Sequence, residues 1–341
     1  MAFNIKKVRH FDTLMNFTTE EIMYLVDQSI KVKENEANGI RPTQLKGKTV
    51  VGIFEKNSTR TANATFKAAN YLGMQYFYNG PTGSNMGTKE SVADTASVFS
   101  EMYDIALYRT FGQDKIEAYA QNSAIPLING LSNLEHPTQT IADLQTIKET
   151  FKSFKGLKVV FAGDFKNNMG HSWMYACAFA GMDLVMYGPK DYVNQLDKNV
   201  YEFCKKLWRK NGGGFYVTEN KLEAARNAHI IATDVWVSLG EPFESWEKRL
   251  AEMHNFQVDK EMMEYAHKDV KFMHCLPAFH DINTEYGKKV AELYGSKYPK
   301  VANGAIEVSS EVFANKNWNI AFIEAGNRWT SIAAIIWELL K

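Results

Sequence analysis

The stretch that decides the fold is Ile53-Phe54-Glu55-Lys56-Asn57-Ser58-Thr59-Arg60-Thr61. The apolar run 49–54 that leads into its polar part predicts a β-strand, and residues 62–72 after it predict a helix. A helix that starts after a strand directs free N–H groups and the positive end of its dipole at the loop before it, which favours a bound anion. Arg60 adds a planar fork suited to phosphate or carboxylate oxygens. The alternative interpretation is an ordinary Ser/Thr helix cap beside a surface arginine.

Length and composition indicate a globular protein of two domains. The chain has 341 residues, of which 45% are hydrophobic and 23% charged, which fits two domains of ordinary size. Lys+Arg and Asp+Glu number 39 each, so no general attraction to nucleic acid or to an anionic membrane is expected. No apolar run approaches about 18 residues, and residues 1–7 lack the apolar core of a signal peptide.

The cysteine pattern and the absent motifs limit which disulfides, nucleotide-binding loops and metal sites can be expected. Three widely spaced cysteines, Cys177, Cys204 and Cys275, do not make a disulfide framework, so we expect a reducing cytoplasm. The sequence contains neither GxxxxGK[ST] nor GxGxxG, which are the usual phosphate-loop and dinucleotide motifs. A metal site at His274, Cys275 and His280 fits the residue types but not the usual ligand spacing.

Strands alternate with helices along the chain, which predicts an α/β fold of two doubly wound, mainly parallel sheets. The segment 151–156 is the expected domain boundary. Helices are predicted over 18–36, 137–151 and 168–180, and the last helix over 330–340, with Asn327-Arg328 at its opening.

Polar clusters follow six of the predicted strands, at the strand ends where such sheets bind ligands. They predict a cleft between the two domains. The clusters are Ser58–Thr61, Arg109, His136–Gln139, Asn167-Asn168, Asp234–Gly240 and His274–Pro277.

Three arginines, Arg60, Arg109 and Arg328, are expected to converge on one phosphate group, because charge-assisted hydrogen bonds hold phosphate oxygens strongly. Read singly, each motif has a structural alternative: a surface salt bridge for Arg109, a solvated helix end for Arg328, and a buried inert thiol for Cys275.

Taken together, the motifs occur in the order found in carbamoyltransferases. Along nearly its whole length the chain resembles the ornithine carbamoyltransferases of the aspartate/ornithine carbamoyltransferase superfamily. The motifs are Ser58–Thr61, Tyr108-Arg109, His136–Gln139, Gly163-Asp164 with Asn167–Gly170, Asp234–Gly240, His274–Pro277 and Asn327-Arg328.

The resemblance implies a carbamoyl-phosphate domain over 1–150, completed by a helix over 326–341 that crosses back, and an ornithine domain over 151–325. It implies catalytic roles for Arg60, Arg109, His136 and Cys275. Carbamoyl phosphate would be bound by Ser58, Thr59, Arg60, Thr61, Asn85, Arg109, His136, Gln139, Cys275, Leu276 and Arg328. Ornithine would be bound by Asn168, Asp234, Ser238 and Leu239. It also implies a homotrimer, or a higher assembly of trimers, in which the Ser84–Lys89 loop reaches a neighbour's site. No metal and no organic cofactor is implied.

Three departures from the family pattern concern these sites. Residues 62–66 read Ala-Asn-Ala-Thr-Phe where the family usually has an arginine and a Ser-Phe-Glu run. Asn85 and Thr88 stand where the interface loop usually carries Gln and His. Leu239 replaces a methionine of similar size, so its backbone contacts should survive.

The expected function is transfer of the carbamoyl group of carbamoyl phosphate to the side-chain amine of L-ornithine, giving citrulline and phosphate, or the reverse reaction. One alternative is a carbamoyltransferase for another amine, such as putrescine. Another is a paralogue that binds ligand without catalysis.

Overall fold

The computed structural model describes residues 10–83, 85–237 and 243–341. The chain forms two compact units: unit 1 contains Met1–Ser153 and Gly326–Lys341, and unit 2 contains Phe154–Ala325. In the described residues, no helix is long and apolar enough to cross a membrane.

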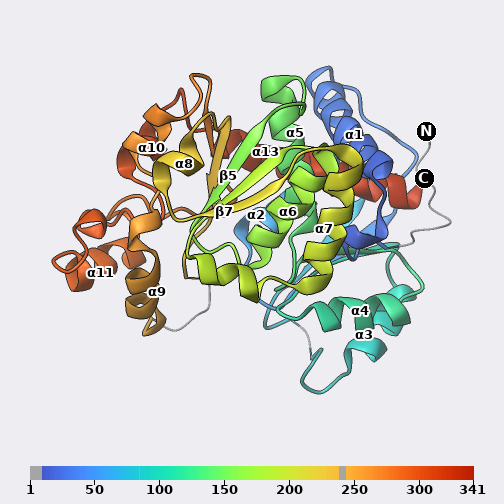
Figure 1. Ribbon diagram of the computed structural model, residues 1–341. Coiled ribbons are helices and arrows are strands. Elements are labelled where there is room, and N and C mark those ends of the chain that lie inside the picture. Colours follow the sequence, from blue (N-terminus) through green and yellow to red (C-terminus); the bar gives the residue numbers. More distant parts are fainter. Residues whose placement is uncertain (1–9, 84, 238–242) are drawn as a thin grey trace. The chain divides into compact units, whose positions relative to one another are not determined.

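Unit 1 is built on a parallel four-stranded sheet of order β2-β1-β3-β4. Its strands are β1 (Thr49–Phe54), β2 (Gln75–Asn79), β3 (Ile105–Arg109) and β4 (Leu127–Leu131). Its helices are α1 (Thr19–Ala37), α2 (Thr59–Tyr71), α3 (Val92–Ser100), α4 (Gln113–Asn122), α5 (Pro137–Phe151) and most of α13 (Ala321–Leu340), with the short 3₁₀ helix η1 (Leu14–Asn16). The end of α13 lies beside α1, although the two helices come from opposite ends of the chain (Figure 1).

The strand order of unit 1 reverses between β1 and β3, which are neighbours in the sheet but not in the sequence. Ligands bind such sheets at the carboxyl ends of the strands on either side of this reversal. Phe54 pairs with Arg109 in the register of β1 and β3. The loop that follows β1 therefore begins next to Arg109.

Unit 2 is built on a parallel five-stranded sheet of order β7-β6-β5-β8-β9. Its strands are β5 (Lys158–Ala162), β6 (Asp183–Tyr187), β7 (Phe215–Thr218), β8 (Ile230–Thr233) and β9 (Lys271–His274). Its helices are α6 (Asn168–Ala180), α7 (Lys198–Asn211), α8 (Lys221–Ala225), α9 (Ser245–Met253), α10 (Lys260–Tyr265), α11 (Glu285–Tyr294) and α12 (Ser310–Ala314), with 3₁₀ helices η2 (Lys190–Gln195), η3 (His254–Phe256) and η4 (Pro299–Val301). The order reverses between β5 and β8, so Asp164 and Asp234 follow the two strands at this point.

The prediction of two doubly wound α/β sheets is confirmed, and so are the bounds of α5 and α6. Two helix starts that concern the predicted site were predicted wrongly. Helix α2 begins at Thr59 rather than at residue 62, so Arg60 and Thr61 lie in its first turn. Helix α13 begins at Ala321, so Asn327 and Arg328 lie inside the helix and do not open it.

Helices α11 and α12 are not among the predicted elements. Helix α11 has Gly287 in its first turn, and it buries little apolar surface, with Val290 as its one buried large side chain. Helix α12 has only five residues. The five residues of α12 are too few to show the apolar periodicity by which a helix is found from sequence, whereas α11 does carry an amphipathic pattern and was not predicted.

Candidate functional site

The first turn of α2 presents the hydroxyls and the guanidinium of the Ser58–Thr61 motif. Ser58 is the N-cap of α2, but its side chain makes no capping hydrogen bond. Thr61 is almost fully buried. The N–H groups of this turn have no partner within the helix, because the first four amides of any α-helix lack one. The motif therefore points amide and hydroxyl donors out of the helix end.

Arg109 and Arg328 meet at the hydroxyl of Thr61. Arg109 Nη1 lies 3.3 Å from Thr61 Oγ1, and Arg328 Nη2 lies 3.2 Å from the same atom. The Arg328 side chain comes from the middle of α13 and is 2% exposed. Two guanidinium groups far apart in the sequence thus converge on the start of α2.

The start of α5 joins the same network. Arg328 Nη1 donates to Gln139 Oε1 at 2.7 Å, and Arg328 Nη2 donates to Thr138 Oγ1 at 3.1 Å. Pro137 is the first residue of α5, and His136 is its N-cap without a side-chain capping bond. The N-termini of α2 and α5 therefore both lie at the Arg328 guanidinium, which concentrates positive potential there.

His136 is buried beside this network and experiences four positive charges. Burial and the charges of Arg328, Arg109, Arg60 and Lys56 hold the pKa of the imidazole well below 6.5. The ring is therefore neutral at neutral pH and can donate an N–H to a carbonyl oxygen without carrying a charge. The electrostatic effect of Arg60 on His136 also places the third arginine in this region of unit 1.

Lys56 is a functional candidate that the sequence reasoning missed. Its ammonium lies 4.5 Å from the centre of the Phe111 ring. Burial and the charge of Arg109 lower the pKa of Lys56. A lysine after a strand is normally taken for a surface residue, and the only available signal was its place inside the 53–61 stretch. We call Lys56, Arg60, Arg109 and Arg328 the cationic cluster.

Glu55 fixes the backbone from which Lys56 extends. Its carboxylate accepts from Tyr108 at 2.6 Å and from Thr110 at 2.7 Å. Lys115 also reaches it, at 3.0 Å. The pKa of this carboxyl is lowered: burial opposes the shift, but the hydrogen bonds from Tyr108, Thr110 and Lys115 outweigh it. Glu55 is thus committed to its own partners in β3, the loop after it and α4.

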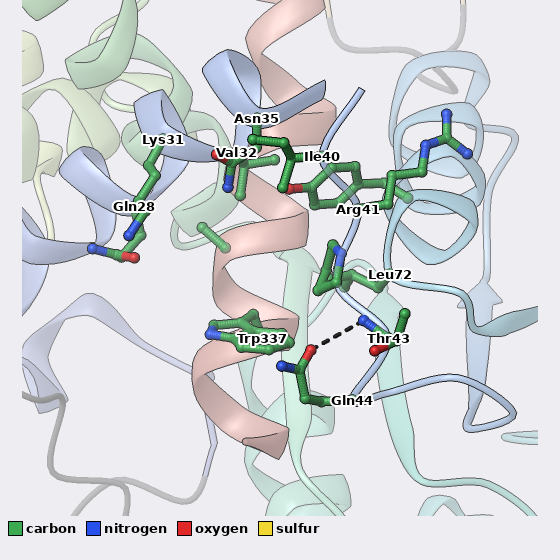
Figure 2. Close-up of a pocket in the computed structure, with 13 residues that line it drawn as sticks. Gln28, Lys31, Val32, Asn35, Ile40, Arg41, Thr43, Gln44, Leu72 and Trp337 are labelled. Atoms are coloured by element: carbon green, nitrogen blue, oxygen red, sulfur yellow. Dashed lines mark hydrogen bonds between the residues drawn. The ribbon is translucent and has the colours of Figure 1, made fainter. Parts of the chain in front are cut away.

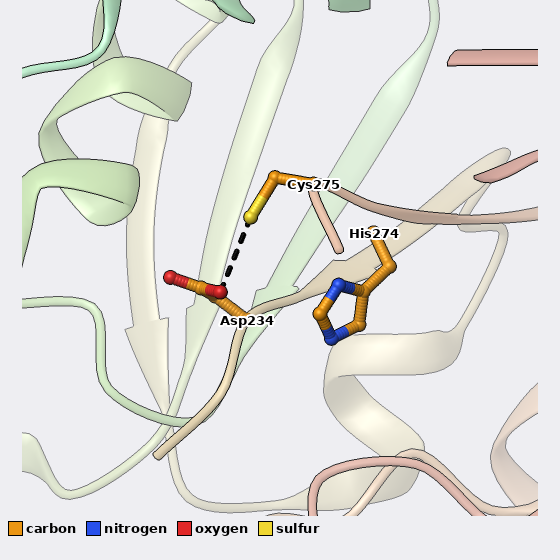
Figure 3. Close-up of side chains that lie close together, drawn as sticks. All are labelled: Asp234, His274 and Cys275. Carbon is orange, nitrogen blue, oxygen red and sulfur yellow. Dashed lines mark hydrogen bonds between the residues drawn. The ribbon is translucent and has the colours of Figure 1, made fainter. Parts of the chain in front are cut away.

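In unit 2, two strand ends bring Asp234 and Cys275 together. Cys275 Sγ lies 3.2 Å from Asp234 Oδ1, and Figure 3 shows the thiol directed at the carboxylate. The Leu276 N–H donates to His274 Nδ1 at 2.8 Å. This bond holds Leu276, whose φ of +57° is rare for a residue with a side chain, in its turn.

Both ring nitrogens of His274 have hydrogen-bond partners within the protein. His274 Nε2 lies 3.2 Å from Glu307 Oε1, and both side chains are fully buried. Since Nδ1 accepts from Leu276, Nε2 carries the proton that is donated to Glu307.

The ligand atoms of Asp234, His274 and Cys275 lie within 4.8 Å of one another, but a metal would have to displace a bond that His274 already makes. The predicted third partner, His280, instead stacks on Phe313 with ring centres 3.8 Å apart. This arrangement does not favour a metal site.

The remaining predicted residues divide into three cases. Asn168 is the first residue of α6, and Asn167 before it caps the helix by accepting from the amides of Met169 and Gly170. Asn85 lies on an exposed turn, and among the described residues no hydrogen bond joins its side chain to the cationic cluster. Ser238 and Leu239 lie outside the described residues.

Unit 1 also contains a separate cavity of about 350 Å³ between α1, the chain that follows it, and α13 (Figure 2). Val32, Leu72 and Trp337 line its apolar side. Arg41 at its edge is paired with Glu36. None of the 13 lining residues belongs to the predicted site.

Two family models match the chain. Residues 9–149 match the carbamoyl-P binding domain of aspartate/ornithine carbamoyltransferase, and residues 155–339 match its Asp/Orn binding domain. The chain belongs to the aspartate/ornithine carbamoyltransferase family. The membership that the motifs indicated is therefore confirmed.

Relatives within this carbamoyltransferase family match over the whole chain. The sequence is 49% identical to the catabolic ornithine carbamoyltransferase of Malacoplasma penetrans and 46% identical to that of Mycoplasma pneumoniae, with 98% of each chain covered. The structure is similar to the ornithine carbamoyltransferase of Pyrococcus furiosus, with a TM-score of 0.85, 31% identity and 97% of each chain covered. The anabolic enzyme of Campylobacter jejuni gives a TM-score of 0.83 at 33% identity, covering 97% of this chain and 98% of that one.

Proposed function

We propose that this carbamoyltransferase moves the carbamoyl group between carbamoyl phosphate and the side-chain amine of L-ornithine, with citrulline and phosphate as the other pair. The observation that carries the proposal is the meeting of Arg109 and Arg328 at Thr61, between two helix N-termini. Such a group of preorganised donors suits a phosphate ester or anhydride and stabilises the phosphate as it leaves.

In this proposal residues 1–150 with 326–341 bind carbamoyl phosphate. Ser58, Thr59 and the cationic cluster hold the phosphate. Arg109, Thr61 and the neutral imidazole of His136 polarise the carbonyl oxygen, so that negative charge developing there meets donors already in place. Gln139 accepts from the carbamoyl amide.

Residues 151–325 bind ornithine in the same proposal. Asp234 suits the ammonium group of an amino acid, and Asn168 suits its carboxylate, together with the 238–239 pair. Cys275 and the Leu276 carbonyl contact the side-chain amine. The Asp234–Cys275 contact at 3.2 Å supports placing the two roles side by side.

The reaction needs no metal or organic cofactor. The neutral amine nitrogen forms a bond to the carbonyl carbon, and a tetrahedral oxyanion forms among the donors of the carbonyl site. The bond from that carbon to the phosphate oxygen then breaks. The proton lost by the amine goes to the departing phosphate, so no carboxylate base is required.

We infer that the chain works in the catabolic direction, in the cytoplasm. The relatives from Malacoplasma penetrans, Mycoplasma pneumoniae and Borreliella afzelii, at 42–49% identity, are named catabolic, whereas the anabolic enzyme of C. jejuni is 33% identical. Cys177, Cys204 and Cys275 are all free thiols, as suits a reducing compartment.

We also propose a homotrimer, or an assembly of trimers, that uses the edge of the unit 1 sheet. The edge strand β2 exposes Phe77 and Tyr78, helix α2 exposes Phe66, and the turn after α3 exposes Met102. Phe77 stacks on Tyr103 and Tyr76 contacts Phe66. Successive side chains of a strand point to opposite faces of the sheet, so both faces carry aromatic contacts at this edge. An exposed apolar edge strand is normally covered by another chain. Phe77→Lys is expected to shift the mass measured by sedimentation towards the monomer.

One assay tests the reaction against its alternatives. The purified chain is given carbamoyl phosphate with ornithine or with putrescine, and in the reverse direction citrulline with phosphate. Citrulline from ornithine, and ornithine from citrulline, are expected. Turnover with putrescine but not with ornithine would show that the acceptor is a diamine. No turnover with either amine would favour a protein that binds ligand without catalysis.

A further inference from the structure

Helix α5 carries two glutamine–carboxylate pairs, each four residues apart and each connected to α13. Gln145 Nε2 donates to Glu149 Oε1 at 2.9 Å, and Gln145 Oε1 accepts from Thr330 at 2.7 Å. Residues four apart on a helix face the same side, so such pairs form readily. The second pair, Gln139 and Asp143, differs because its partner on α13 is Arg328.

The partners of Gln139 determine which way its amide points. Gln139 Nε2 lies 2.7 Å from Asp143 Oδ1, and Gln139 Oε1 lies 2.7 Å from Arg328 Nη1. A carboxylate only accepts hydrogen bonds and a guanidinium only donates them. The NH₂ group must therefore face Asp143, and the carbonyl oxygen must face Arg328 and the cationic cluster. All three side chains are buried.

We propose that Asp143 is a positioning residue that fixes the Gln139 amide with its carbonyl oxygen toward the cationic cluster, and that this orientation selects carbonyl phosphates bearing an N–H group. The inference rests on the proposed function. The Gln139 carbonyl oxygen has two lone pairs, so it can accept from Arg328 and from a carbamoyl N–H together.

The orientation matters because the alternative would be repulsive for the substrate. A flipped Gln139 would direct its NH₂ group at the guanidinium of Arg328 and at the NH₂ group of carbamoyl phosphate, which are all donors. Acetyl phosphate has a methyl group in place of the carbamoyl NH₂, so it would lose nothing from the flip. A site that hydrogen-bonds an N–H group discriminates strongly against an analogue without it.

The test measures the binding of carbamoyl phosphate and of acetyl phosphate, and the turnover with carbamoyl phosphate. The variant Asp143→Asn keeps the shape but can present either a donor or an acceptor to Gln139. We expect at least a tenfold fall in the preference for carbamoyl over acetyl phosphate, because a flipped Gln139 amide no longer accepts from the carbamoyl N–H group. Binding of inorganic phosphate should change less than about threefold, because the arginines remain.

The control is Glu149→Gln, which changes the carboxylate of the pair that does not contact Arg328. Glu149 also pairs with Lys33 at 2.7 Å, so this variant loses an ion pair as well. It should keep the wild-type preference. A second comparison tests whether the effect of Asp143 passes through Gln139. If Asp143 acts only through Gln139, Asp143→Asn should have no further effect on the preference in a Gln139→Met background.

Three results with the variants would overturn the proposal: an unchanged preference in Asp143→Asn, an equal loss in Glu149→Gln, or additive losses in the Gln139→Met double variant. Failure of the proposed function is distinguishable, since the wild-type chain would then fail to form citrulline at all. A wild-type enzyme that forms citrulline but binds the two phosphates equally would overturn only the orientation proposal.

Discussion

Arg328 donates to the hydroxyl of Thr61 at 3.2 Å across 267 residues of sequence. The same guanidinium reaches Gln139 and Thr138 on α5. One side chain on the C-terminal helix therefore connects the N-termini of α2 and α5.

The first prediction follows from that fork. Arg328→Lys keeps the positive charge but cannot donate to Gln139 and Thr61 through two separate nitrogens. We expect the kcat for citrulline formation to fall by about 10²-fold, as when a preorganised donor is removed from a developing charge. The control is Thr330→Val on the same helix, which removes a buried hydrogen bond to Gln145. It should lower the melting temperature while leaving kcat within about twofold.

Arg60 is tested against an arginine of the same unit that lies away from the cationic cluster. Arg60→Ala should lower kcat/KM for carbamoyl phosphate by about 10²–10³-fold, because a charged donor to the leaving phosphate is lost. Arg41→Ala removes an exposed arginine that pairs with Glu36, and such pairs contribute little. Near-normal turnover of Arg60→Ala in a steady-state assay would remove the role proposed for it.

The motif that follows β1 was predictable because its chemistry is local. Hydroxyls and an arginine after an apolar strand are visible in the sequence, and the sheet order then places Arg109 beside them. The same local signals gave the bounds of α5, with Pro137 in its first turn.

The start of α13 was not predictable by the same means. Glu324, Asn327 and Arg328 look like the polar end of a helix, yet all three are buried. Their partners are far away in sequence: Glu324 accepts from the His274 amide, and Asn327 donates to Thr146. Only the tertiary fold shows that these polar groups have partners, so the apolar periodicity of the sequence underestimates the length of the helix.

Lys56 gives a prediction that concerns the imidazole next to it. Its charge is one of the causes that depress the pKa of His136. Lys56→Met should therefore raise that pKa towards its ordinary value, measured by NMR titration of the ring C–H signals. Lys67→Met is the control, because Lys67 lies over Trp329 on the outside of α2. An unchanged His136 titration in Lys56→Met would show that the lysine does not act on the cluster.

Cys275 should affect the amine more than the phosphate. Cys275→Ala removes the thiol that faces Asp234, so we expect KM for ornithine to rise severalfold and the affinity for carbamoyl phosphate to change little. Cys204→Ala, at a buried cysteine of α7, should lower stability without this selective effect. Equal losses for both substrates in Cys275→Ala would contradict the division of roles.

Glu135 precedes His136 and gives the stability a distinctive pH dependence. Its carboxyl is fully buried, where it accepts from the Leu14 amide at 3.1 Å, and burial raises its pKa from 4.5 to about 8, with the Asp12 charge adding to the shift and Thr13 and Leu14 opposing it. The folded state thus keeps a proton that the unfolded chain releases above pH 4.5. The stabilisation is complete below that pH and is lost as pH rises to about 8, at about 1.4 kcal/mol per pH unit.

Glu135→Gln should remove this dependence, because an amide keeps an acceptor for Leu14 and carries no charge at any pH. In urea unfolding at pH 5, 6.5 and 8, the free energy of unfolding of the variant should rise relative to that of the wild-type chain as the pH rises. The difference in free energy of unfolding should be small at pH 5 and should reach a few kcal/mol at pH 8. Parallel curves for the two proteins would mean that Glu135 is ionised in the folded state. The hydrogen bond from the Leu14 amide to Glu135 would then be made to a buried carboxylate rather than to a neutral carboxylic acid.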